Sequence, residues 1–212
     1  RLLGEAISQL ENPVKLWINF SGVSIFNGGT SLKDETSKEY SNDFLGSLAQ
    51  DWEKTFLAAH TPNTEKLILR MSPILTKKSG MFAELYPLAK MGLAGQVGDG
   101  KQMIAWIHEA DFVGMIDWII KSDHRADIYH ACSPNPVSNA EFMQKLRHAS
   151  GVSFGLPLPT FMAKMGAFVK GVDSSLLLES VPVTTLLTLK NGFQFNFPYL
   201  QPAFDQLIKS ST

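Results

Sequence analysis

Hydrophobic and polar positions alternate between strand-like and helix-like segments along the chain. Residues 14–20 and 65–71 are nearly continuous apolar runs, which is typical of strands buried on both faces of a sheet. Residues 127–131 predict a third, shorter strand. Each run is followed by a segment whose apolar residues recur at helical spacing. This order predicts an α/β fold with a parallel sheet.

The predicted helices differ in how clearly their ends are marked. We expect helices over residues 1–12, 43–60, 81–91, 112–122 and 138–149. Ser138 and Glu141 form a capping box, which predicts a helix start at that point. The helix over 43–60 is amphipathic and carries on one face Phe44, Leu48, Trp52, Phe56 and Leu57.

A short apolar stretch, residues 102–111, ends in a polar pair and opens directly into the helix over 112–122. Asp111, or Glu109 before it, is expected to cap this helix, because the first backbone N–H groups of a helix have no internal partner. Gln102, Trp106 and His108 then lie at the mouth of a helix, where open α/β sheets bind ligands.

The pattern changes at Gly151, where the regular alternation of strands and helices ends. A proline-rich connector leads to three expected short helices over 160–170, 173–180 and 182–190. Residues 193–197 alternate apolar and polar side chains and predict a small strand, and residues 204–208 predict a closing helix. We therefore divide the chain into residues 1–150, an α/β domain, and residues 151–212, a smaller and mostly helical lobe.

Composition narrows the class of protein. Apolar residues make up 44% of the 212 residues and charged residues 18%, as in soluble globular proteins. The net charge of −1 gives no field to attract nucleic acid or an anionic membrane. Cys132 is the only cysteine, so the sequence predicts neither an intrachain disulfide nor a cysteine-rich metal site. With no secretory signal visible, we expect a cytoplasmic protein. The ligand-binding edge of an α/β sheet suits a small-molecule substrate, and a homodimer is compatible with the sequence.

Several motifs resemble one family. Trp106-Ile107-His108 with Asp111, preceded by the Gly98–Gln102 turn, resembles the atypical extended short-chain dehydrogenase/reductases of the sugar-nucleotide epimerase-like kind. The same resemblance is carried by further short motifs, namely Ser21-Gly22, Asp51-Trp52-Glu53, Leu69-Arg70, Pro134-Asn135-Pro136-Val137 with Asn139, and Lys190-Asn191-Gly192-Phe193.

The resemblance implies a Rossmann domain that binds NADP(H), or NAD, with a smaller C-terminal lobe that closes the pocket. No glycine-rich dinucleotide fingerprint follows a strand anywhere in this chain. We therefore expect the chain to be the C-terminal part of such a protein, without the upstream strands and their phosphate-binding turn.

The family's Tyr-x-x-x-Lys pair is missing. Its two positions fall on Leu45 and Ala49, which cannot transfer a proton, and the assisting serine position falls on Val23, next to Ser24. By this resemblance we expect catalytic roles for Ser24 and His108, cofactor contacts from Ser21, Gly22 and Arg70, and substrate contacts from Gln102, Trp106 and Asn135.

Each candidate also has a purely structural interpretation. Arg70 can form an ion pair that closes a strand end, His108 can be a structural histidine, and Trp106 can belong to the core. Gln102 and Asn135 can be ordinary turn residues.

Three functions stay open. The first is an NADP(H)-dependent epimerase or oxidoreductase with atypical catalytic residues, acting on a nucleotide sugar or a small carbonyl compound. The second is a non-catalytic nucleotide-binding regulatory protein on the same scaffold, favoured by the loss of both Tyr and Lys. The third is an unrelated α/β enzyme, which predicts that the C-terminal lobe would not cover the strand ends near His108.

Overall fold

The computed structural model describes residues 2–123, 125–159 and 180–209. In chain order its elements are α1 (Leu2–Ser8), β1 (Leu16–Gly22), the 3₁₀ turn η1 (Val23–Ile25), α2 (Phe44–Leu57), β2 (Glu65–Met71), β3 (Ile74–Leu75), α3 (Gly80–Lys90), β4 (Met103–Ile104), β5 (Ile107–His108), α4 (Glu109–Lys121), β6 (Ile128–Ala131), β7 (Val137–Ser138), α5 (Asn139–Ala149), α8 (Leu186–Lys190) and α9 (Leu200–Lys209).

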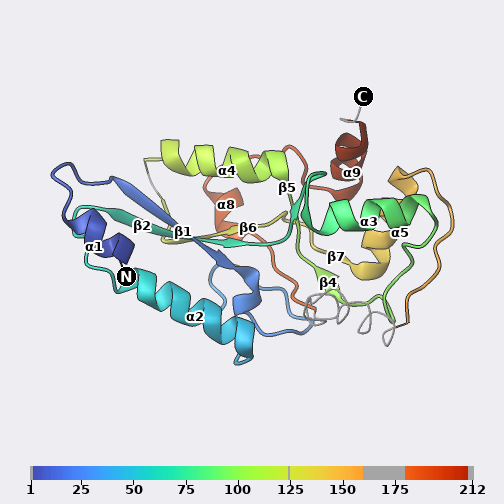
Figure 1. Cartoon of the computed structure of the whole chain (residues 1–212), viewed down its shortest axis with the longest axis horizontal. Helices are drawn as coiled ribbons and strands as arrows, with labels where there is room; N and C mark the ends of the chain where they lie inside the picture. The colour runs from blue at the N-terminus through green and yellow to red at the C-terminus, as the bar shows by residue number, and fades with distance from the viewer. Residues whose placement is uncertain (1, 124, 160–179, 210–212) are drawn as a thin grey trace.

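The predicted parallel sheet is confirmed. β1, β2 and β6 form a three-stranded sheet in the order β1-β2-β6, with both pairings parallel (Figure 1). The registers place Ser21 beside Arg70, and Arg70 beside His130. Neighbours across a sheet point to the same face, so these three side chains share one side of it.

The two faces of the sheet are covered by different helices. Figure 1 shows α2 on one side and α4 on the other. On the α4 side a buried apolar cluster joins the strands to that helix and contains Leu67, Leu69, Ile107, Met115, Ile119, Tyr129, Ala131 and Phe193. The side that carries Arg70 and His130 faces α2 and is the more polar one.

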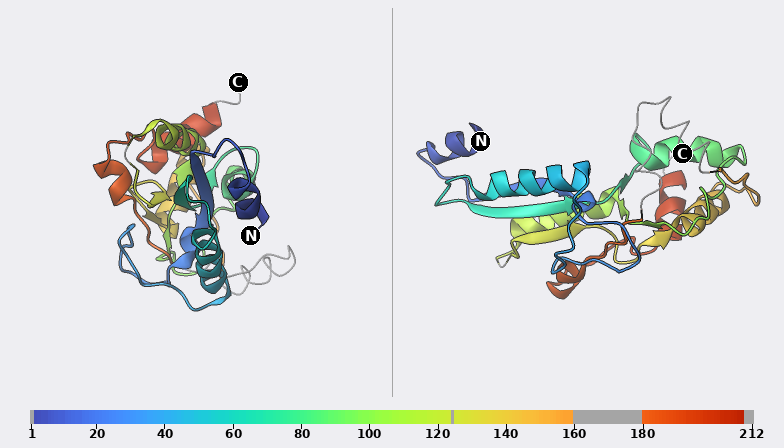
Figure 2. Two further views of the ribbon diagram at one scale, coloured as in Figure 1. Left: turned by 90° about the vertical axis from the view of Figure 1, so that its left-hand side faces the viewer. Right: turned by 90° about the horizontal axis from the view of Figure 1, so that it is seen from below.

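A second cluster lies beyond the ends of the strands. Helices α3, α5 and α9 gather there around Trp106, Phe142 and Phe204 (Figure 2). Trp106 is fully buried in this cluster. The residues after 180 therefore pack onto both apolar clusters, α8 against the sheet and α9 against α5.

Side-chain caps start α4 and α5, and one of the two predicted caps was wrong. Ser138 Oγ accepts a hydrogen bond from the Glu141 N–H and starts α5 as predicted. The residue that caps α4 is His108, whose Nδ1 accepts from the Ala110 N–H, so the expected Asp111 or Glu109 cap was wrong. The carboxylate of Asp111 instead binds the backbone N–H groups of Asn196 and Phe197, at 2.7 and 2.9 Å.

Two further predictions about the C-terminal segment were wrong. Residues 193–197 form no strand, because their N–H groups bond to Asp111 and to Thr188 rather than to a neighbouring strand. The ring of Phe193 packs against those of Phe195 and Trp118, at 4.8 and 5.6 Å between centroids. The helix expected over 182–190 begins only at Leu186, and the closing helix begins earlier than expected, at Leu200. The helices expected over 160–170 and 173–180 lie almost entirely outside the described residues.

The apolar face predicted for α2 is mostly exposed. Only Phe56 is buried, whereas Phe44, Leu48, Trp52 and Leu57 are each more than half exposed.

No helix among the described residues is long and apolar enough to span a bilayer.

The carboxylate of Asp111 is fully buried and accepts three hydrogen bonds from the 196–197 segment. We expect Asp111→Asn to lower the free energy of unfolding by about 3 kcal/mol, because the amide loses the charge-assisted bonds and can turn a donor toward buried donors. Urea denaturation measures this. Asp117→Asn, at an exposed ion pair with Lys121, is the control and should change stability by less than about 1 kcal/mol. Equal losses in the two variants would contradict the anchoring role.

His108 makes stability depend on pH. It is buried, its Nε2 lies 2.9 Å from Gln206 Oε1, and its ring lies 4.1 Å from that of Phe197. Burial lowers the pKa of His108 below its ordinary value of 6.5, against the opposing effect of the Gln206 hydrogen bond. The unfolded chain therefore binds a proton more readily than the folded one, and stability falls as the pH drops below about 6.5.

We expect His108→Asn to reduce this acid slope, which for one group is at most about 1.4 kcal/mol per pH unit. Asparagine keeps an oxygen that can cap α4, so this variant removes the titrating ring and preserves the helix start. Unfolding free energies measured between pH 5 and 8, with the exposed His60→Asn as control, give the result. An unchanged slope in His108→Asn would show that other groups set the pH dependence.

Candidate functional site

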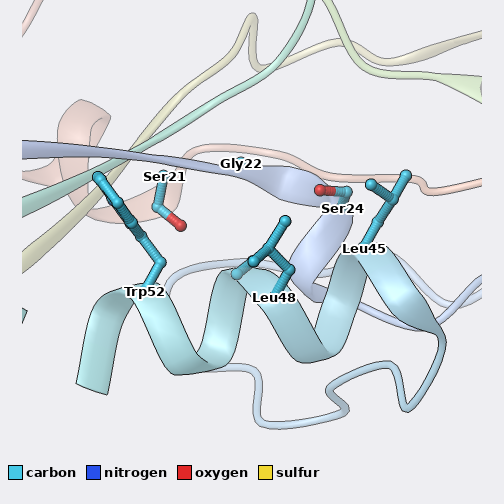
Figure 3. Close-up of a pocket in the computed structure, with 7 residues that line it drawn as sticks. Ser21, Gly22, Ser24, Leu45, Leu48 and Trp52 are labelled. Atoms are coloured by element: carbon cyan, nitrogen blue, oxygen red, sulfur yellow. The ribbon is translucent and has the colours of Figure 1, made fainter. Parts of the chain in front are cut away.

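A pocket of about 370 Å³ lies between the end of β1 and helix α2. Its lining consists of Ser21, Gly22, Ser24, Leu45, Leu48, Ala49 and Trp52 (Figure 3). It opens at the carboxyl end of a parallel strand, where α/β sheets bind ligands. Its volume lies at the lower end of the range for small-molecule sites.

Local structure explains why these residues meet. β1 ends at Gly22 and passes at once into the 3₁₀ turn η1, which brings Ser24 back over the pocket. On the other wall, Asp43 Oδ1 accepts from the Gly46 N–H at 2.7 Å and sets the first residue of α2. The Ser41 hydroxyl donates to the same carboxylate, and these hydrogen bonds hold the pKa of Asp43 below its ordinary value. Leu45 and Ala49 are therefore fixed one turn apart on the pocket wall.

The wall residues are chemically simple. Leu45, Leu48 and Ala49 are apolar, and only the Ser21 and Ser24 hydroxyls contribute polar side-chain atoms besides the indole of Trp52. That indole donates to the Phe20 carbonyl at 3.0 Å, which holds the ring across the outer side of β1. Figure 3 shows the Ser21 hydroxyl directed toward α2. The residues that line this pocket can bind an apolar ring and orient a polar group, but none is an ordinary acid or base at neutral pH.

A buried ion pair joins α2 to the sheet close to this pocket. Arg70 Nε and Nη2 donate to the two carboxylate oxygens of Glu53, both at 2.8 Å. The guanidinium also lies 5.2 Å from the ring of Phe26 and 5.4 Å from that of Tyr40. Burial alone would lower the pKa of Arg70, but the hydrogen bonds to Glu53 outweigh it and raise the pKa above its ordinary value. The guanidinium of Arg70 is therefore charged at neutral pH.

The structure brings together Ser21, Gly22 and Ser24 from the predicted site. Leu45 and Ala49, the positions at which the family resemblance places the tyrosine and the lysine, line the same pocket. Arg70 belongs to the ion pair with Glu53 and is not among the residues that line the pocket.

The other predicted site residues lie elsewhere: His108, Trp106 and Asn135 lie where the strand ends meet the C-terminal segment, and Gln102 lies in the turn after Val97. Trp106 Nε1 donates to the Asn135 carbonyl at 3.1 Å, and Asn135 Nδ2 donates to the Pro198 carbonyl at 2.9 Å. Gln102 Nε2 donates to the Val97 carbonyl. His108 is covered by Phe197 and Gln206, contrary to the expectation for an unrelated α/β enzyme.

Sequence reasoning missed a second buried polar group, centred on Glu35. Its carboxylate accepts from the Thr185 hydroxyl and from the N–H groups of Leu186 and Leu187, at 2.9, 2.9 and 3.1 Å, and from the His130 N–H at 3.3 Å. His130 is fully buried. Nothing local in the sequence marks Glu35, because its partners lie about 95 and 150 residues further along the chain.

Comparisons with known proteins agree with this geometry. No family model matches the chain. The human epimerase family protein SDR39U1 is 30% identical over 211 residues, which are 98% of this chain and 70% of the relative. The epimerase family protein YfhF of Bacillus subtilis is 28% identical over 203 residues, 94% of this chain and 65% of the relative.

Solved structures give the same assignment. The crystal structure of human SDR39U1 (isoform 2) with NADPH superposes with a TM-score of 0.88 at 29% identity, over 98% of this chain and 70% of that one. A nucleoside-diphosphate sugar epimerase from Corynebacterium glutamicum superposes with a TM-score of 0.77 at 23% identity, over 97% of this chain and 40% of that one, and shares the fold. The sheet, the pocket at the end of β1 and these relatives together show that the chain belongs to the SDR39U1 epimerase family of extended short-chain dehydrogenase/reductases.

Proposed function

We propose that this protein binds the nicotinamide end of NADP(H) in the pocket between β1 and α2. The observation that carries the proposal is the meeting of Ser21, Gly22, Ser24, Leu45 and Ala49 around one pocket at the end of a parallel strand. The human relative with the same fold is described in complex with NADPH.

The residues of the pocket fit one end of the cofactor. Leu45, Leu48 and Ala49 offer an apolar wall for an aromatic ring, and the buried Ser21 hydroxyl has no hydrogen-bond partner among the described residues, so it is free to bind a carboxamide or a ribose hydroxyl. The volume of about 370 Å³ suits the nicotinamide ring and its ribose rather than the whole dinucleotide. We propose that the pyrophosphate and adenosine lie outside this pocket.

The proposed reaction class is hydride exchange with a nucleotide sugar or a small carbonyl compound. Bound NADP(H) supplies or accepts the hydride. The protein's residues position the ring against the Leu45 wall and hold the reacting oxygen near the serine hydroxyls, while Trp52 shields one side. A non-catalytic nucleotide-binding role is the second candidate, and it is favoured by the apolar residues at positions 45 and 49.

The cofactor proposal predicts stabilisation by NADPH. At a ligand concentration 100 times the dissociation constant, linkage stabilises the folded state by about 2.7 kcal/mol. We expect Leu48→Trp, which fills the pocket, to weaken binding at least about tenfold, a loss of about 1.4 kcal/mol. Leu57→Trp changes an equally exposed leucine of α2 outside the pocket and should leave binding unchanged. Thermal-shift titration measures both variants, and equal weakening in the two would argue against this pocket.

A variant that restores the missing tyrosine and lysine distinguishes a catalytic role from a role in nucleotide binding alone. Leu45→Tyr with Ala49→Lys places an acid and its cationic partner on the pocket wall beside Ser21. We expect reduction of a carbonyl panel, followed by NADPH absorbance, to become about 10²-fold faster, the lower range for a positioned general acid. Leu45→Phe with Ala49→Met has similar bulk without a transferable proton and should give no gain. A gain in both variants would exclude proton transfer as its cause.

A further inference from the structure

Three neighbouring strands place three polar side chains in one row, on the face of the sheet against which α2 packs. Ser21 of β1 lies beside Arg70 of β2, and Arg70 lies beside His130 of β6. Adjacent strands are about 4.8 Å apart, so one small molecule such as water can span the distance between neighbouring side chains of the row. All three residues are more than nine-tenths buried. We call Ser21, Arg70 and His130 the polar row.

The hydrogen bonds of His130 define its tautomer. Nδ1 lies 2.9 Å from the Thr184 carbonyl oxygen, which can only accept. Nδ1 therefore carries a proton, and in the neutral ring Nε2 is an acceptor. Among the described residues Nε2 has no hydrogen-bond partner.

The other two members of the row have complementary groups. Arg70 uses Nε and Nη2 for Glu53, and its Nη1, a donor, has no partner within the described part of the chain. The Ser21 hydroxyl, both donor and acceptor, is likewise without one. A donor, an acceptor and a hydroxyl without partners in one buried row are groups of the kind that buried water satisfies.

The surroundings favour a neutral imidazole. Phe26 packs against two of the three residues of the row, 5.4 Å from the ring of His130 and 5.2 Å from Arg70 Cζ. Burial lowers the pKa of His130, and the charge of Arg70 acts in the same direction, while the carboxylates of Glu35 and Asp34 oppose them. An acceptor at Nε2 and a nearby counter-charge for the protonated ring are both present.

We propose that ordered water joins Arg70 Nη1, His130 Nε2 and Ser21 Oγ, and that this row conducts a proton between the pocket and His130. Ser21 is its end in the pocket, where Tyr and Lys are replaced by Leu45 and Ala49. This proposal rests on the proposed NADP(H)-dependent function.

The proton balance is simple. When a secondary alcohol of the substrate is oxidised, its C–H bond gives a hydride to NADP⁺ and its O–H proton passes to Ser21 Oγ. The proton of Ser21 passes through the water to Nε2 of His130, which becomes imidazolium. Reduction of the carbonyl reverses each transfer. Arg70 stays charged throughout and orients the water.

The test uses the 212-residue chain with ¹⁵N-labelled histidine and long-range ¹H–¹⁵N correlation spectra. We expect His130 to be protonated at Nδ1 and hydrogen-bonded at Nε2. Ser21→Ala should shift the Nε2 resonance, whereas Ser24→Ala, a serine of the same pocket outside the row, should leave it in place. His130→Asn keeps a donor for the Thr184 carbonyl and assigns the signal by its loss.

A second readout needs no assignment. If water bridges Ser21 Oγ into the row, Ser21→Ala removes a bound partner and lowers the melting temperature; a dry hydroxyl without a partner predicts an unchanged or higher one. A protonated Nε2, or the same Nε2 shift in the wild-type chain and in Ser21→Ala, overturns the proton path. Neither measurement requires cofactor, so absence of NADPH binding with an intact Nε2 response would overturn the proposed function and leave the row in place.

Discussion

The side of the sheet that carries the pocket depends on the buried pairing of Arg70 with Glu53. Two charges removed from water are stable there only because both bonds of a bidentate pair form at 2.8 Å. The pair joins α2 to β2, next to the gap between α2 and β1 in which the pocket lies. Loss of one partner leaves an uncompensated buried charge, which typically costs about 3–5 kcal/mol. The pair therefore acts on the site without lining it.

The C-terminal segment is held by two other carboxylates. Glu35 binds the first N–H groups of α8, and Asp111 binds those of residues 196 and 197. Both are buried, and both satisfy backbone donors that no strand or helix pairs. Segments far apart in the chain are thus joined by side chain to backbone bonds, which orient the later segment without the help of a sheet.

Features set by residues close together in the sequence could be predicted, and features set by hydrogen bonds between distant segments could not. The strand over 65–71 and the Ser138 cap follow from patterns within a few residues, and the structure has both. The alternation in 193–197 has the period of a strand, but a strand needs a neighbour, and Asp111 takes the N–H groups of 196 and 197 instead. The apolar pattern of α2 predicted its helix but not which of its residues would be buried. Of the predicted site, Ser21, Gly22 and Ser24 are near neighbours in the sequence and meet in one pocket. His108 and Asn135 lie outside that pocket and contact Gln206 and Pro198, and Trp106 lies with them.

The indole of Trp52 links the pocket to the open side of the sheet. The Glu65 N–H donates to the Lys15 carbonyl, so by the alternation of a parallel ladder the odd-numbered residues of β1 turn their backbone groups toward β2 and the even-numbered ones turn them away. The Phe20 carbonyl is one of the outward groups, and Trp52 already uses it. A strand added alongside β1 would compete with the indole for that oxygen. Extension of the sheet and the shape of the pocket wall are therefore coupled, because a strand that takes the Phe20 carbonyl would release the Trp52 ring that lines the pocket.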